Sequence, residues 1–229
     1  MTRRSGRAAR LQQPSAAPAP RAPLDPDTLT HHATTVGQGR VALIACGALA
    51  REILAVNRAN GADHFTLRCL PAILHNHPER IAPAVEREII SAKSEGYDAI
   101  FILYADCGTG GELDVVCARH AVTRLPGPHC YAFFEGVAAQ ASREEVTSFY
   151  LTDFLARQFD TFVTKPLGLE AHPELREMYF GNYERLVYLA QTDDDALTRK
   201  AESAAETLGL RFERRFTGYG DLATALAGF

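Results

Sequence analysis

Cysteine and histidine side chains stand at the ends of four short, mostly apolar runs of this sequence. Cys46 closes the run "VALIAC", and Cys107 follows directly on "AIFILYAD". Cys130 ends the turn "PGPHC", and His75 lies in "LHNHPE", which follows the run "FTLRCL". Zn²⁺ prefers thiolate and imidazole ligands, in a tetrahedral shell that can leave one position open for a substrate. If the four runs are neighbouring strands, the sequence predicts a zinc site formed by His75, Cys107 and Cys130.

The other cysteines have simpler explanations, and Cys46 has several. A cysteine that closes a buried strand is often only a small apolar side chain, so Cys46 could pack, act as a fourth ligand or be a reactive thiol. We take it as the candidate catalytic thiol. Cys69 lies within an expected strand and Cys117 within an expected helix, so we assign both to packing.

The histidines near these cysteines are not equivalent. His77 precedes Pro78 and fits the start of a helix, whereas His75 comes directly after an apolar leucine and is the better candidate to face a cleft. His129, beside Cys130, is either a supporting group or an exposed turn residue.

The turn "YADCGTGG" is the most distinctive of these places. Its glycines, Gly108, Gly110 and Gly111, free the backbone to expose the Cys107 thiol, and the start of the following helix would lower its pKa. The same glycine-rich turn could instead bind the anionic group of a cofactor with its N–H groups. It matches neither a Walker nor a Rossmann fingerprint, so a nucleotide is a weak candidate.

A second glycine-centred turn occurs late in the chain, in "MYFGNYERLVYL". Tyr179, Asn182 and Tyr183 surround Gly181 there. These side chains could hold a substrate over the pocket, or the tyrosines could simply pack against the end of a helix.

The elements that must position these residues alternate along the chain. Segments at helical spacing separate β-rich runs at 40–46, 64–70, 97–105, 121–125, 146–152, 185–190 and 211–216. The clearest of these helical segments are 78–96 and 194–210, and 154–163 is another. This alternation predicts an α/β fold with a mainly parallel sheet and helices on both faces, a Rossmann-like three-layer arrangement. Ligands bind beyond the carboxyl ends of the strands in such sheets, which is where the candidate residues lie.

The domain organisation follows from the composition. Residues 1–37 are rich in Arg, Ala and Pro, have no acid before Asp25 and lack an apolar core; they could be a transit peptide, but a disordered leader is the simpler interpretation. We assign 38–229 to a single α/β domain that could form two lobes, with 162–173 as the candidate boundary.

Bulk properties exclude several classes of protein. The net charge of −4 over 229 residues argues against nucleic acid as a partner, and no apolar run is long enough to cross a membrane. The odd number of cysteines, five, favours a reducing compartment, so we expect a cytoplasmic protein. A homodimer is the default expectation for its assembly.

Six motifs together resemble the bacterial and archaeal family of unknown function numbered 1638. They are "ACGALAREI", "LPAILHNHPERIAPAVEREI", "YADCGTGG", "GPHCYAFFEG", "SFYLTDFLARQFD" and "YFGNYERLVYLAQTDD", and the resemblance covers about 41–218. It implies a metal or thiol site at Cys46, His75, Cys107 and Cys130. Members of that family are often encoded beside corrinoid-dependent methyltransferase systems, so the resemblance also implies methyl transfer.

Three functions are compatible with these residues. The first is a zinc-dependent transferase, a methyltransferase in type, that acts on a small-molecule substrate. The second is an accessory protein that binds a metal or a corrinoid and serves a methyltransferase or corrinoid protein. The third is a metal-free enzyme with Cys107 as nucleophile and His75 as base. An iron–sulfur cluster held by three cysteines is a further variant of the metal site.

Overall fold

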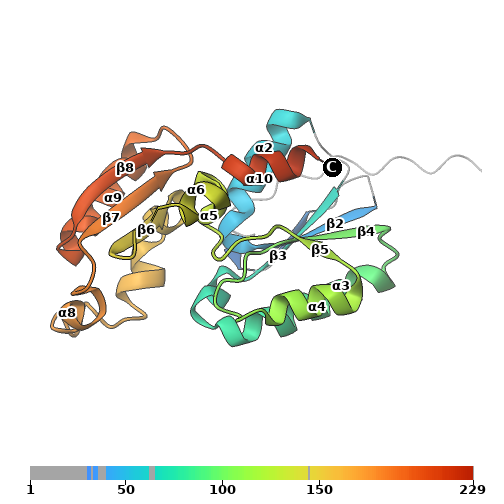
Figure 1. Ribbon diagram of the computed structural model, residues 1–229, viewed down its shortest axis with the longest axis horizontal. Coiled ribbons are helices and arrows are strands. Elements are labelled where there is room, and N and C mark those ends of the chain that lie inside the picture. The colour runs from blue at the N-terminus through green and yellow to red at the C-terminus, as the bar shows by residue number, and fades with distance from the viewer. Residues whose placement is uncertain (1–29, 32, 36–39, 62–64, 144, 229) are drawn as a thin grey trace, which may run out of the picture.

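The computed structural model describes residues 30–31, 33–35, 40–61, 65–143 and 145–228. Its strands form two separate sheets, one of five strands and one of three. Figure 1 shows these sheets toward opposite ends of an elongated molecule, with the short helices α5 (Ala132–Glu135) and α6 (Val137–Ala141) between them. The alternation of strands and helices along the chain confirms the predicted α/β class.

The first sheet contains four parallel strands in the order β3-β2-β4-β5. They are β2 (Val41–Cys46), β3 (Phe65–Leu70), β4 (Ala99–Leu103) and β5 (Thr123–Arg124). Strand β1 (Ala33–Thr35) pairs antiparallel with β3 at one edge. The central strand β2 is buried along almost its whole length. This explains its continuous apolar sequence, since parallel strands are covered on both faces.

Helices cover both faces of this sheet, as Figure 1 shows. Helices α2 (Ala50–Asn60) and α10 (Gly220–Ala227) lie on one side, and α3 (Ile81–Ser94) and α4 (Glu112–His120) lie on the other. The apolar residues of α3 at helical spacing, Ile81, Val85 and Ile89, are all buried against the sheet. The three-layer arrangement predicted from the sequence is therefore confirmed.

The second sheet is built from three parallel strands in the order β6-β7-β8. They are β6 (Ser148–Thr152), β7 (Arg185–Ala190) and β8 (Arg211–Phe216). Helix α8 (Leu175–Phe180) precedes β7, and α9 (Asp195–Leu208) packs on β7 and β8. Asp194 caps the start of α9, and Gly209 ends it in the left-handed conformation.

The structure differs from the sequence expectations at three places. The strands divide between two sheets, and β5, with two residues, offers little edge for a further strand. The change of sheet falls between β5 and β6, upstream of 162–173, which contributes Val163 and Leu169 to the core of the second sheet. Strand β1 belongs to the stretch 1–37 that we expected outside the fold, of which 1–29 lies outside the described residues.

Two expected helices also change form. The segment 78–96 begins with a single 3₁₀ turn, Pro78–Arg80, before α3, because Pro83 lies in the first turn of the α-helix and cannot donate a bond there. The segment 154–163 divides into α7 (Asp153–Arg157) and a π-helical turn, Asp160–Thr164. No helix within the described part of the chain is long and apolar enough to cross a membrane.

A fully buried carboxylate joins the first two strands of the second sheet. Asp153, directly after β6, accepts hydrogen bonds from the Tyr188 hydroxyl at 2.7 Å and the Gln191 N–H at 3.0 Å. Both the N–H and the hydroxyl of Thr192 donate to its other oxygen. The carboxylate thus collects four donors from the end of β7 without leaving any of its oxygens unpaired.

Apolar and charged contacts connect the two sheets. Ala72, after β3, packs with Phe154 and Phe162 of the second sheet in a small buried cluster. The buried Glu52 of α2 accepts a hydrogen bond from Arg157 of α7 at 3.2 Å. The chain also returns from the second sheet to the first, because α10 packs against α2 and α5.

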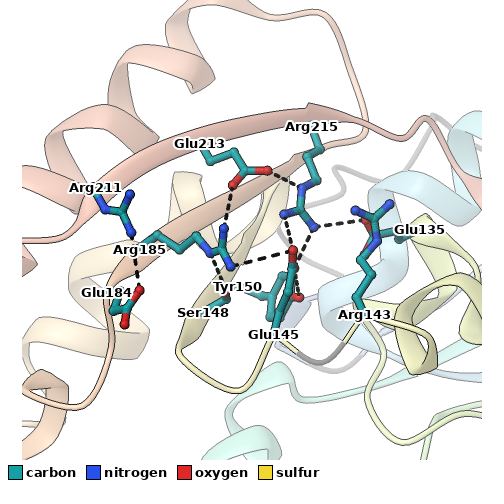
Figure 2. Close-up of polar contacts among 10 residues, drawn as sticks. All are labelled: Glu135, Arg143, Glu145, Ser148, Tyr150, Glu184, Arg185, Arg211, Glu213 and Arg215. Carbon is teal, nitrogen blue, oxygen red and sulfur yellow. Dashed lines mark hydrogen bonds and ion pairs between the residues drawn. The ribbon is translucent and has the colours of Figure 1, made fainter.

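An ionic network reinforces this connection, as Figure 2 shows. Arg215 of β8 donates to both oxygens of Glu145 at 2.8 and 2.9 Å and to Glu135 of α5 at 3.3 Å. Arg143 forms a second ion pair with Glu135, and the Tyr150 hydroxyl of β6 donates to Glu145 at 2.7 Å. One arginine on the outermost strand therefore holds the segment that links the sheets.

This network predicts an acid-sensitive contribution to stability. Hydrogen bonds from Arg215 lower the pKa of Glu145 from its ordinary value of 4.5 to about 2. The stabilisation is therefore present at neutral pH and is lost as the pH falls from about 4.5 toward about 2. We expect Glu145→Gln to lower the free energy of unfolding at pH 7 by at most about 1 kcal/mol, since the carboxylate is close to solvent.

Thermal unfolding measured between pH 7 and pH 3 checks this prediction. The wild-type protein should lose more stability over that range than Glu145→Gln, because the variant no longer has this carboxylate to protonate. Equal losses in the two proteins would show that the pair with Arg215 does not contribute.

Candidate functional site

The structure brings three of the five cysteines together at the carboxyl ends of the first sheet's strands. The Sγ atoms of Cys107 and Cys130 lie 3.2 Å apart. The Cys46 thiol, at the end of β2, lies close enough to both for their charges to interact. Cys69 in β3 and Cys117 in α4 are buried in the core, in agreement with their assignment to packing. We call Cys107 and Cys130 the thiol pair.

Backbone hydrogen bonds hold the two members of the thiol pair together. The N–H of Asp106 donates to the carbonyl of Gly127 at 2.9 Å, and the N–H of Cys107 donates to that of Pro128 at 2.8 Å. These bonds join the turn after β4 to the turn after β5. Two cysteines that are distant in sequence are thereby fixed side by side.

The turn after β4 has an unusual backbone at the thiol itself. Cys107 has a φ of 48°, in the left-handed region that non-glycine residues rarely adopt. Gly108 follows with a φ of 86°, and a Cβ there would lie 3.3 Å from the side chain of Pro78. Such conformations persist where the surrounding structure enforces them, and they occur often at functional sites.

The N–H groups of this turn are occupied by a side chain of the turn. The Asp106 carboxylate accepts hydrogen bonds from the N–H of Gly110 at 3.2 Å and from that of Gly111 at 2.8 Å. The Thr109 hydroxyl donates to it as well. An external anion would therefore have to displace the Asp106 carboxylate from the N–H groups that these glycines were predicted to offer to a cofactor.

The contact between the two thiols shifts their pKa values in opposite directions. The hydrogen bond with Cys130 lowers the pKa of Cys107, while the same bond and burial raise the pKa of Cys130. Burial raises the pKa of Cys46 to about 12. Cys107 is thus the more readily ionised thiol of the pair.

A buried tyrosine hydroxyl lies beside the thiols, close to Cys46. Tyr104, just after β4, is 1% exposed. Burial, followed by the charges of Cys46 and Cys130, raises its pKa. Tyr104 was not predicted as a site residue, although a tyrosine two residues before Asp106 in an otherwise apolar run is a signal in the sequence.

The histidines divide between a cavity and the surface. His75 and His129 both line a cavity together with Cys130. Burial lowers the pKa of both, and in His75 the charge of His129 adds to the effect. His77 instead lies at the surface, 3.7 Å from Glu79, where no role in the site is indicated. The neutral form of His75 and His129 is therefore favoured at neutral pH.

The cavity lies between the two sheets and has a volume of about 60 Å³. We call it the central cavity. Residues that follow strands of the first sheet form one wall of the cavity. Residues that follow β6 of the second sheet form the opposite wall. Its lining residues are Ala48, Leu49, His75, His129, Cys130, Tyr131, Phe134, Thr152, Phe154, Leu155 and Phe162. The thiol pair therefore meets the cavity through Cys130.

The tyrosines predicted to hold a substrate lie elsewhere. Tyr183 packs edge-on against Phe149 and next to Phe180, with ring centroids 5.9 Å away in both cases. Tyr179 is 42% exposed at the end of α8. Neither these tyrosines nor Asn182 belongs to the lining of the central cavity. The aromatic side chains that do line it, such as Phe154 and Phe162, were not predicted, because they follow a strand of the other sheet.

The described residues contain no group of three or more His, Cys, Asp or Glu side chains arranged to hold a metal ion. The predicted ligands are placed as follows: Cys107 and Cys130 are in contact, and His75 shares the wall of the central cavity with Cys130. The arrangement as it stands is a thiol pair beside two imidazoles.

These features define an α/β protein of the Rossmann-like class with a cysteine site between two parallel sheets. The family model described as protein of unknown function (DUF1638) matches residues 69–226. The chain belongs to this family, as its motifs predicted. Searches of curated proteins and of solved structures find no match to the chain.

Proposed function

We propose that this protein is an enzyme that uses the thiol pair to act on a small molecule bound in the central cavity. The observation that carries the proposal is the 3.2 Å contact between the Cys107 and Cys130 sulfur atoms at the cavity wall. A thiolate with a thiol as its neighbour is a nucleophile with an acid beside it.

The pair can perform the transfer of a carbon group from its leaving group to sulfur. The Cys107 thiolate, which contacts Cys130 at the cavity wall, would attack an electrophilic carbon brought to the pair, so that an S–C bond forms while the bond to the leaving group breaks. The leaving group takes the electron pair and then the proton of the Cys130 thiol. The neutral His75 could take up a proton in a later step, since it lines the same cavity.

Alkylation of the protein with iodoacetamide, followed by peptide mapping, tests this proposal. Modification should reach one residue of the thiol pair first, because Cys46 and Cys69 are buried with raised pKa values. A protein in which all five cysteines react at the same slow rate would contradict the proposal.

A zinc-dependent transferase is a second candidate, supported by the third thiol, Cys46, near the pair. Tetrahedral zinc with Zn–S bonds of about 2.3 Å separates two thiolates by roughly 3.8 Å. To bind zinc, the two sulfur atoms of the thiol pair would have to move apart from their 3.2 Å separation, and Cys46 or His75 would have to move toward the metal. For a protein with zinc at this site, the family resemblance favours methyl transfer as the reaction. It also favours an accessory role in which the protein binds a metal or a corrinoid.

Metal analysis separates the two candidates. The thiol enzyme predicts protein that reacts with iodoacetamide without a metal, and the zinc enzyme predicts about one equivalent of zinc that protects the pair from alkylation. Zinc that is retained in a Cys107→Ser, Cys130→Ser double variant would contradict a zinc site at the pair.

A further inference from the structure

We propose that the thiol pair is a site of reversible oxidation, at which hydrogen peroxide joins Cys107 and Cys130 in a disulfide and a dithiol reductant restores the two thiols. The disulfide would remove the nucleophile of the proposed enzyme. This inference therefore names the regulation of the same site, and that consequence rests on the proposed function. Formation of the bond itself rests on the placement and exposure of the two sulfur atoms.

The two sulfur atoms are close enough to bond without a change of fold. They lie 3.2 Å apart, although their residues are 23 positions apart in the sequence. The bond length of a disulfide is about 2.0 Å, so the sulfur atoms have to approach each other by about 1.2 Å. Rotation of the two side chains changes the distance between sulfur atoms by this much while the backbone stays in place.

Backbone contacts fix the two cysteines beside each other before any bond forms. The N–H of Cys107 donates to the carbonyl of Pro128 at 2.8 Å, and the N–H of Asp106 donates to that of Gly127 at 2.9 Å. The left-handed φ of Cys107, 48°, is a conformation that persists where the surroundings enforce it. Folding therefore brings the two thiols together, and reaction between groups held in this way is favoured strongly over reaction between free ones.

Solvent reaches the thiol pair and not the other cysteines. All five cysteines lie in the described part of the chain, and Cys46, Cys69 and Cys117 are only 5%, 2% and 5% exposed. Both members of the pair are partly exposed, and Gly108, next to Cys107, is exposed. A small oxidant in solution therefore meets the pair first, since oxidation of a cysteine requires access to its sulfur.

Hydrogen peroxide supplies the oxidising equivalents in two steps. The Cys107 thiolate first attacks one peroxide oxygen, so that an S–O bond forms and the O–O bond breaks. This step gives a sulfenic acid and hydroxide, which takes up a proton to become water. The Cys130 sulfur then attacks the Cys107 sulfur, and an S–S bond forms while the S–O bond breaks. Hydroxide leaves with the Cys130 proton as a second water, and two electrons have passed from the thiols to the peroxide.

The neighbouring thiol makes this oxidation reversible. A sulfenic acid without a partner is oxidised further to sulfinic acid, which ordinary thiol reductants do not repair. Cys130 stands in contact with Cys107 and can capture the sulfenic acid before that happens. The resulting disulfide is open to attack by a dithiol, which returns both cysteines to the reduced form and is itself oxidised to a disulfide.

Peroxide treatment of the reduced full-length chain tests the inference. After one equivalent of peroxide, the remaining thiols are blocked with iodoacetamide and the protein is digested without reductant. Mass spectrometry should show the peptides of Cys107 and Cys130 linked, with two hydrogen atoms lost, in most of the chains. Dithiothreitol should then restore both thiols. A link that is absent, or sulfinic acid at Cys107 in place of the link, would overturn the inference.

Two variants show whether the link belongs to this pair. Cys130→Ser removes the capturing thiol, so the linked peptide should disappear and dimedone should label a sulfenic acid at Cys107. Cys117→Ser is the matched control, because it removes a buried thiol of α4, and the link should form within about twofold of the wild-type rate. A link from Cys107 to Cys46 that forms in Cys130→Ser as fast as the wild-type link would overturn the role of Cys130.

Alkylation of the reduced protein, measured beside the peroxide reaction, separates this inference from the proposed function. Selective alkylation of the thiol pair without disulfide formation would overturn the inference and leave the proposed enzyme standing. A reversible disulfide in a protein whose five reduced cysteines are all alkylated at the same slow rate would support the oxidation site and contradict the enzyme. If both hold, the oxidised protein should be alkylated at the pair at least about tenfold more slowly than the reduced protein.

Discussion

Replacement of Cys107 with serine is expected to lower the rate of iodoacetamide alkylation at pH 7 by about 100-fold or more. The reason is that the remaining thiols are mostly in their protonated form. Burial raises the pKa of Cys46 to about 12 and also raises that of Cys69. Because only the thiolate is a nucleophile, each unit of pKa above the ambient pH removes about tenfold of the reactive form.

Replacement of its partner should have a smaller effect in the same direction. Cys130→Ala removes the hydrogen bond that lowers the pKa of Cys107, so less thiolate is present at pH 7. A thiolate of higher pKa is intrinsically more nucleophilic, which offsets part of the loss. We therefore expect the Cys107 alkylation rate to fall about threefold to tenfold. Cys117→Ala is the matched control, since it removes a thiol from α4 and should leave the rate unchanged.

Two outcomes would contradict this account of the pair. The first is a fast alkylation that persists in Cys107→Ser and maps to Cys46. The second is an equal or faster reaction of Cys107 in Cys130→Ala, which would show that Cys130 does not hold the thiolate. Peptide mapping by mass spectrometry distinguishes these sites directly.

Replacement of Asp153 with alanine should give the largest loss of stability, about 3–5 kcal/mol in the free energy of unfolding. The carboxylate is fully buried and accepts four hydrogen bonds from the Tyr188 hydroxyl, the Gln191 N–H and Thr192. Alanine would leave these donors without partners in the interior, and each unpaired donor costs about 1–3 kcal/mol when water cannot reach it.

Urea unfolding of the variant and of a control measures this effect. Asp193→Ala removes an acid that also pairs with an arginine, Arg214, at 2.6 Å, but its side chain is 83% exposed. It should therefore cost at most about 1 kcal/mol. Similar losses in the two variants would show that the Asp153 hydrogen bonds contribute no more than a surface ion pair does.

The strands and most helices of this protein could be predicted from the sequence, because their signals are local. The apolar run that ends at Cys46, the glycine after Leu208 and the helical spacing of 78–96 all predict elements that the structure contains. The assignment of strands to two sheets could not be predicted in this way. The assignment depends on which strand edges pair with each other, and the sequence of a single segment does not determine that pairing.

The candidate site shows the same division. The thiol pair follows from the rule that neighbouring parallel strands end at one edge, which brings the turns of Cys107 and Cys130 together. The opposite wall of the central cavity comes from Phe154 and Phe162, and only the packing of two sheets places them there. The turn of Tyr183, in contrast, was a plausible substrate contact by composition, and its ring is used in packing.

The absorbance of thiolate at 240 nm tests the central claim most directly, because it counts ionised thiols in the metal-free protein. As the pH is raised, the wild-type protein should begin to form thiolate at a lower pH than Cys107→Ser, since the hydrogen bond with Cys130 lowers the pKa of Cys107. An absorbance that is the same in both proteins, and that rises only above about pH 8.5 as an ordinary thiol titrates, would contradict the claim.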